Sequence, residues 1–174
     1  MEASLNYDRT FADKHAVSAM LLFNRRHYDD GSALPYRNQG LAGRASYTYN
    51  GKYVAEFNFG YNGTENFAKG KRYGFFPSAA IGWIVSEEPF MQPLRNTISK
   101  LKLRASYGQV GNDVYTVGGV AQRFLYEEKW SQISNDYMFG TSGKSGIYET
   151  QYPNHGVTWE RAHKYNVGLE FGLW

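Results

Sequence analysis

The chain has 174 residues, enough for one domain with a sizeable core, and it contains no cysteine, which excludes disulfide bonds and thiolate metal sites. Its formal net charge of +3 is too small to indicate a nucleic-acid or anionic-lipid partner. The 15 Tyr, 11 Phe and 4 Trp accompany a mean hydropathy of −0.58. That pairing is expected where strands alternate an apolar face with a polar face and aromatic residues ring a membrane interface.

The first half of the chain alternates apolar and polar residues with a period of two, the pattern of half-buried β-strands. Residues 3–8 and 15–24 are predicted to form strands joined by a tight turn through residues 11–13. Residues 41–49 and 53–61 follow as a clearer pair. Asn50-Gly51 lies between them and favours a type I′ hairpin turn, because both central positions of that turn need a positive φ.

The same alternation returns in residues 73–85, 101–107 and 165–171, which brings the predicted total to about seven strands with no long helix. Ser86 is predicted to cap a single helical turn in the connection over residues 86–99, with acidic residues in its first turn. No apolar run approaches the roughly 18 residues of a membrane-spanning helix. The first 30 residues also lack the pattern of a signal peptide, so we expect that one has been removed or that the chain is part of a longer protein.

The predicted connections alternate in length, with short turns over residues 10–14 and 50–52 and longer polar segments over residues 25–38, 63–72 and 109–156. Short turns at one end and long loops at the other are typical of outer-membrane β-barrels, in which only a closed sheet satisfies every backbone group in lipid. The polar strand positions carry charges that suit a wide, wet or plugged lumen. We expect these residues to face the lumen: Arg44, Glu56, Lys102, Arg104, Lys164 and Glu170.

Several colinear motifs resemble the barrel strands of the SusC/RagA family of TonB-dependent outer-membrane receptors. The segment over residues 71–83, KRYGFFPSAAIGW, is similar to that family's "RYGFFPS…GW" strand, and residues 86–90, SEEPF, are similar to the turn that follows it. Residues 101–113 resemble its "LKLRASYG…GND" segment, and residues 159–170 its "WE…YN-G" strand. The matches span almost the whole chain and are specific when taken together.

The resemblance implies an all-β fold: residues 1–174 would form part of a transmembrane antiparallel β-barrel of about 22 strands, with no plug domain in the chain itself. It also implies a cell outer-membrane protein that imports glycans or peptides with a SusD-like surface lipoprotein and with TonB as partners. Outer-membrane lipid and an oligosaccharide or peptide substrate are the other expected partners. No nucleic acid, cofactor or enzymatic activity is expected.

The sequence shows no catalytic or metal-binding constellation, because none of the four histidines has the spacing of a metal motif. Ligand contacts are instead expected in the long loop over residues 112–156, where exposed aromatic rings would stack on sugar faces or peptide side chains. The candidate ligand-binding residues are Tyr115, Trp130, Tyr137, Tyr148 and Tyr152. Packing of these rings within the loop, or in a membrane-interface girdle, is the simpler interpretation.

Two alternatives remain open on the sequence alone. One is a passive porin-like barrel without a plug, which has the same strand pattern. The other is a soluble glycan-binding β-sandwich, whose strands also alternate apolar and polar residues.

Overall fold

The computed structural model describes residues 1–29, 31, 34–140 and 142–173, apart from the side chains of residues 135–139 and 142. It divides into two compact units. We call residues 1–63, 73–111 and 161–174 the sheet unit, and residues 64–72 and 112–160 the loop unit. Within the described residues, no helix is long and apolar enough to cross a membrane.

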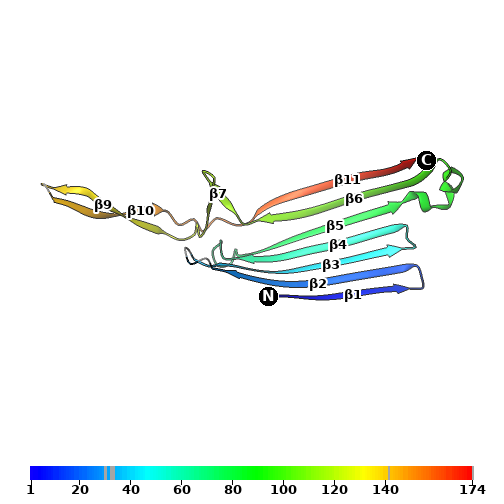
Figure 1. Ribbon diagram of the computed structural model, residues 1–174, viewed down its shortest axis with the longest axis horizontal. Helices are drawn as coiled ribbons and strands as arrows, with labels where there is room; N and C mark the ends of the chain where they lie inside the picture. The colour runs from blue at the N-terminus through cyan, green and yellow to red at the C-terminus, as the bar shows by residue number, and fades with distance from the viewer. Residues whose placement is uncertain (30, 32–33, 141, 174) are drawn as a thin grey trace. The chain divides into compact units, whose positions relative to one another are not determined.

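The sheet unit is a single seven-stranded antiparallel sheet in the order β1-β2-β3-β4-β5-β6-β11, with β1 and β11 at its two edges (Figure 1). The prediction of about seven strands is therefore confirmed, and every strand except β5, which ends at Ile84, extends beyond the segment that the alternation marked. The strands are β1 (Glu2–Phe11), β2 (His15–Tyr28), β3 (Tyr36–Tyr49), β4 (Tyr53–Thr64), β5 (Tyr73–Ile84), β6 (Ile98–Asn112) and β11 (Glu160–Leu173).

The connections at one end of the sheet are compact. Asn50 and Gly51 have φ values of 51° and 67°, so the predicted β3–β4 hairpin turn with two positive φ angles is confirmed. The β5–β6 connection forms two 3₁₀ helices, η1 (Val85–Glu87) and η2 (Pro89–Leu94). Ser86 lies inside η1 and no side-chain cap is present, so the predicted Ser86 cap is wrong; the turn begins one residue earlier and is closed by the bond from the Glu88 N–H to the Val85 carbonyl.

The register places the aromatic residues of neighbouring strands on one face of the sheet. On this apolar face Tyr53 lies opposite Trp83, and Tyr61 lies opposite Phe75. The other, polar face carries Glu56, which lies opposite Ala80. Many apolar-face side chains remain exposed, Ile81 at 65% among them, so this face has no core of its own in the described chain. A soluble β-sandwich would need a second sheet packed on this face, and the described sheet unit contains only one layer.

An aromatic row crosses four strands near one end of the apolar face, and an aromatic pair lies towards the other end. At the end with the short turns, ring centroids lie 5.0 Å apart for His15 and Tyr49, 6.3 Å for Tyr49 and Tyr53, and 6.2 Å for Tyr53 and Trp83. Towards the other end, the rings of Tyr61 and Tyr73 stack with centroids 5.2 Å apart. The distance from Tyr53 to Tyr61 along β4 is roughly 26 Å, at about 3.3 Å per residue.

The loop unit has two hairpins of its own. Strand β7 (Tyr115–Val117) pairs with β8 (Val120–Gln122), and β9 (Lys129–Phe139) pairs with β10 (Ser142–Gln151). The segment over residues 109–156, expected as one long loop, is thus partly regular. Its small core includes Phe67 and Phe124, which are 3% and 9% exposed.

Candidate functional site

The loop unit is organised around the segment of residues 64–72. The buried ring of Phe67 packs on the indole of Trp159, with centroids 5.5 Å apart and planes inclined by 59°. The indole N–H of Trp159 donates to the Arg72 carbonyl at 3.2 Å, and Arg72 Nε donates to the Phe67 carbonyl at 3.1 Å. One aromatic contact and one hydrogen bond therefore join the segment to Trp159, about ninety positions later in the chain, and the Arg72–Phe67 bond closes the segment on itself.

Further hydrogen bonds join this segment to the other parts of the loop unit. Arg72 Nη2 lies 3.5 Å from the Tyr126 hydroxyl, which itself donates to the Glu65 carbonyl at 3.3 Å. The Asn66 amide donates to the Asp113 carboxylate at 3.2 Å and to its carbonyl at 3.3 Å. These bonds fix the start of the segment that leads into β7.

An open cleft of about 730 Å³ lies within the loop unit, a volume in the range of roughly 300–1,000 Å³ usual for small-molecule sites. Its lining combines carboxylate, amide and hydroxyl groups with a few apolar side chains. The lining residues are Phe67, Asn112, Asp113, Val114, Tyr115, Thr116, Asn154, Gly156, Val157, Thr158 and Glu160. No Lys, Arg or His is among them, so the two carboxylates give the cleft a negative charge.

Both carboxylates of the cleft are held by asparagine amides. Asn112 Nδ2 donates to Glu160 Oε2 at 3.0 Å, and Asn66 Nδ2 donates to Asp113 Oδ2 at 3.2 Å. Asn112 is itself fixed, because its Oδ1 accepts the Val114 N–H at 3.1 Å. A carboxylate has about four lone-pair positions, so each acid retains capacity to accept hydrogen bonds from a ligand.

The five aromatic residues proposed from the sequence lie in different places. Tyr115, 53% exposed, lines the cleft. Trp130 and Tyr148 lie on the β9–β10 hairpin, where the register pairs Trp130 with Glu149 and Tyr148 with Ser131, so the two rings point to opposite faces. Tyr152 follows β10 and is 79% exposed. The Tyr137 side chain lies outside the described residues.

The predicted lumen-facing charges all lie on the polar face of the sheet unit. Arg44 Nη2 lies 2.5 Å from Glu56 Oε2, and the Asn58 amide donates to the same carboxylate at 2.8 Å. Lys102 lies on β6 two residues before Arg104, which places both on one face, and it is 3.7 Å from Glu170 on β11. Lys100 completes this group at 2.7 Å from Glu170, a partner that the sequence analysis did not include.

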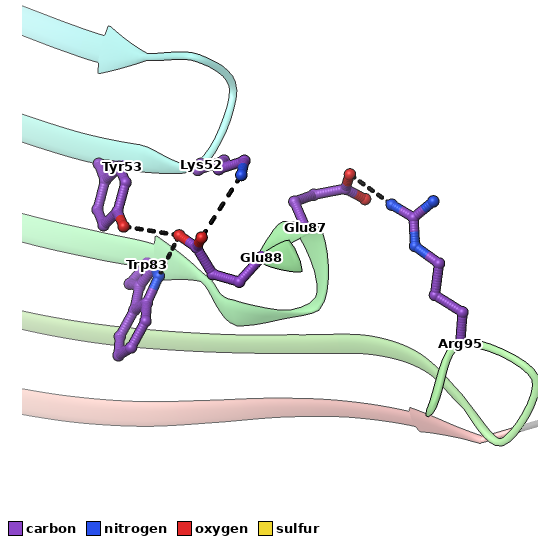
Figure 2. A network of polar contacts seen from close by, with 6 residues as sticks. All are labelled: Lys52, Tyr53, Trp83, Glu87, Glu88 and Arg95. Carbon is purple, nitrogen blue, oxygen red and sulfur yellow. Dashed lines mark hydrogen bonds and ion pairs between the residues drawn. The ribbon is translucent and has the colours of Figure 1, made fainter. Parts of the chain in front are cut away.

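A second polar cluster joins the β5–β6 connection to the neighbouring hairpin, as Figure 2 shows. The Glu88 carboxylate accepts hydrogen bonds from the Tyr53 hydroxyl at 2.6 Å and from the Trp83 indole at 3.2 Å, and it lies 3.5 Å from Lys52 Nζ. The bond from Tyr53 is the largest cause that lowers the pKa of Glu88 below its ordinary value of 4.5; the Trp83 bond and the Lys52 charge add to it. Nearby, Arg95 pairs with Glu87 at 2.7 Å.

Sequence reasoning missed most of the cleft, although two signals pointed to it. The "GND" and "WE" motifs contain Asn112, Asp113 and Glu160, which line the cleft, and Trp159, which packs on the lining residue Phe67. Asn66 had no signal in the sequence, because its partner is 47 residues away. Within the described residues, no group of three or more histidine or acidic side chains could hold a metal ion.

Comparison with known proteins finds relatives that are TonB-dependent receptors, although no family model matches the sequence. The chain is 33% identical over 132 residues to the TonB-dependent receptor P3 of Formosa agariphila, a match that covers 75% of this chain and 12% of that protein. It is 32% identical over 134 residues to the TonB-dependent receptor SusC of Bacteroides thetaiotaomicron, covering 75% of this chain and 13% of SusC. The chain thus spans about an eighth of the length of these curated relatives.

The fold has a match among solved structures. A structure of the RagAB peptide importer in its closed-closed state superposes with a TM-score of 0.77 over 99% of this chain and 21% of that chain, at 17% sequence identity. At that identity the likeness concerns the fold, and it shows that the seven-stranded sheet matches part of a larger barrel.

Proposed function

The chain is homologous to a segment of the TonB-dependent receptors of the SusC/RagA type, and from that premise we propose that it forms wall strands and outer loops of an active importer of oligosaccharides or peptides. TonB-dependent receptors are outer-membrane proteins, and they are transporters and not enzymes. The proposed receptor works with TonB and with a SusD-like surface lipoprotein, and its plug lies outside residues 1–174.

The separation of the two faces of the sheet is the observation that supports this function most strongly. In the proposed arrangement the apolar face contacts lipid, and its aromatic row and its Tyr61–Tyr73 pair lie at the two membrane interfaces, since barrels of this class carry an apolar band about 25 Å tall flanked by aromatic girdles. The polar face, with Arg44, Glu56, Lys102 and Arg104, lines a lumen wide enough for charged side chains. The loops opposite the short turns, including the cleft with Tyr115, then face outward and meet the substrate.

Uptake by living cells tests active import against passive diffusion. Cells of the source organism that lack the gene are compared with the parent for uptake of labelled oligosaccharides and peptides, with and without a protonophore. Active import predicts uptake that is lost both on deletion of the gene and on addition of the protonophore. Uptake that depends on the gene and persists with the protonophore would instead identify a porin-like channel.

A further inference from the structure

We infer that the loop-unit cleft is a charge-selective subsite for uncharged saccharide units, and that Asp113 and Glu160 exclude acidic ligands from it. This inference rests on the proposed function, because it names the class of substrate that the outer loops accept. It assigns a ligand class to residues whose sequence motifs alone suggested none.

The negative charge of the cleft opposes the binding of acidic ligands. Asp113 and Glu160 are the carboxylic acids of the lining, and among the described residues no basic side chain is part of the lining, although Lys71 Nζ donates to the adjoining His155 carbonyl at 2.7 Å. A uronic acid, a sulfated sugar or a peptide C-terminus would bring a like charge to these carboxylates, and like charges that meet without compensation oppose binding. A neutral ligand meets no such barrier.

The hydrogen-bond donors and acceptors that line the cleft match those of a sugar ring. Two carboxylates that only accept hydrogen bonds lie beside the hydroxyls of Tyr115, Thr116 and Thr158, which donate and accept. Sugar hydroxyls also donate and accept, so one ring can give hydrogens to the acids and take them from the hydroxyls. A hydrogen bond to a charged acceptor is stronger than one between neutral groups.

The positions of the two acids are set before a ligand arrives. The Asn66 amide holds Asp113 and the Asn112 amide holds Glu160, so Asn66 and Asn112 are positioning residues. Pre-organised acceptors bind at a lower entropic cost than side chains that must be ordered by the ligand. The same two bonds therefore hold both acceptors in place in an open cleft.

The apolar part of the cleft favours a sugar over a peptide side chain. Phe67 is 3% exposed and already packs on Trp159, so it offers no pocket for an apolar side chain. Val114 and Tyr115 are each about half exposed, at 52% and 53%. Tyr115 is thus accessible to a ligand, and an aromatic ring can stack on the C–H face of a sugar ring.

The test measures binding by the full receptor that carries this chain, purified in detergent, to an array of neutral oligosaccharides, uronic-acid oligosaccharides of equal length, and peptides. The D113N/E160Q variant removes both charges while each amide oxygen can still accept the asparagine bond. E128Q serves as the matched control, because it removes an acid of the loop unit that does not line the cleft.

The unmodified receptor should bind neutral oligosaccharides most tightly. D113N/E160Q should bind them about tenfold more weakly. The ratio of its affinities for neutral and uronic-acid oligosaccharides should fall by at least the same factor. E128Q should behave like the unmodified receptor. Preferential binding of acidic oligosaccharides or peptides, absence of neutral-sugar binding, or unchanged selectivity in D113N/E160Q would each overturn the inference. Because gene-dependent, protonophore-sensitive uptake is a separate measurement, failure of the inference can be told apart from failure of the proposed import function.

Discussion

The Glu88 carboxylate accepts a 3.2 Å hydrogen bond from the indole nitrogen of Trp83, five residues earlier in the chain. The same Oε1 atom accepts the Tyr53 hydroxyl at 2.6 Å, so one acid joins the β5–β6 connection to the aromatic row of the apolar face (Figure 2). Glu88 is only 9% exposed, although it lies outside the sheet, between the two 3₁₀ helices of the connection. The motif SEEPF therefore contains an anchor for this end of the sheet.

Replacing Glu88 should loosen this connection. E88A leaves the Tyr53 hydroxyl and the Trp83 N–H without their acceptor, and unmet polar groups are costly where water is scarce. E88Q keeps an acceptor oxygen and should have a smaller effect. Limited proteolysis of residues 85–97 in the full receptor measures the difference. The control is E87Q, which changes the exposed partner of Arg95. Equal protease resistance in E88A and the unmodified protein would contradict the anchoring role.

The same anchor should weaken in acid. The folded-state pKa of Glu88 is lowered from 4.5, so its ionised form is favoured by folding and its contribution is complete above pH 4.5. That contribution is lost as the pH falls from 4.5 through the lowered pKa. We expect hydrogen exchange in residues 85–97 to accelerate over this interval. The difference between the unmodified protein and E88Q isolates Glu88 from other carboxylates; a difference that does not change below pH 4.5 would refute the prediction.

Phe67 should be a main source of stability in the loop unit. Phe67→Ala removes a ring that is 3% exposed and packs on Trp159, and such truncations cost about 3–5 kcal/mol. The loss should appear as faster exchange of the Asn154 amide, which donates to the Leu125 carbonyl at 2.8 Å. Val120→Ala, at a position 63% exposed on β8, should change this exchange little. Similar exchange in both variants would show that Phe67 does not stabilise the unit.

The assignment of the two sheet faces can be tested at adjacent alanines of β5. Ala79 lies on the apolar face opposite Phe57, and Ala80 lies on the polar face opposite Glu56. Arginine near the middle of the lipid-facing surface of a barrel costs about 2–4 kcal/mol. Ala79→Arg should therefore lower the stability of the receptor folded in lipid vesicles by this amount, whereas Ala80→Arg should change it by less than about 1 kcal/mol because it can pair with Glu56.

Denaturant unfolding in vesicles measures both variants against the same parent. Because the two substitutions are identical and one residue apart, differences in side-chain volume or helix and strand propensity do not confuse the comparison. A larger loss for Ala80→Arg than for Ala79→Arg would reverse the assignment of the faces.

The strands were predictable because apolar and polar residues alternate along a strand whose two faces lie in different surroundings. Residues 53–61 alternate aromatic and polar side chains, and the structure contains β4 over Tyr53–Thr64. The ends of longer strands were not predictable: β3 begins at Tyr36, but Arg37, Asn38 and Gln39 are all polar and show no alternation. Where both faces of a strand meet polar surroundings, hydrophobic periodicity carries no signal. The β9–β10 hairpin was missed because the sequence of its strands shows no sustained alternation either.

The cleft was less predictable than the sheet because it depends on contacts that are distant in sequence. Tyr115 was anticipated from its place in a long loop, but the acids and their asparagine partners were not. Asn66 and Asp113 are 47 residues apart, and Asn112 and Glu160 are 48 apart. The motifs mark Asn112, Asp113 and Glu160, but nothing in the sequence shows which side chains pair until the fold brings them together.

The directions of the two edge strands decide whether the number of further strands needed to close a barrel is odd or even. Direction alternates from strand to strand, so β1 and β11, the first and seventh in spatial order, run the same way. Joining them to each other would create a parallel pair, whereas bacterial barrels of this kind are antiparallel throughout and even in strand number. Any such barrel that incorporates this sheet must therefore place an odd number of strands between β11 and β1. The rule holds whatever the size of the barrel, and it constrains any reconstruction of the complete wall.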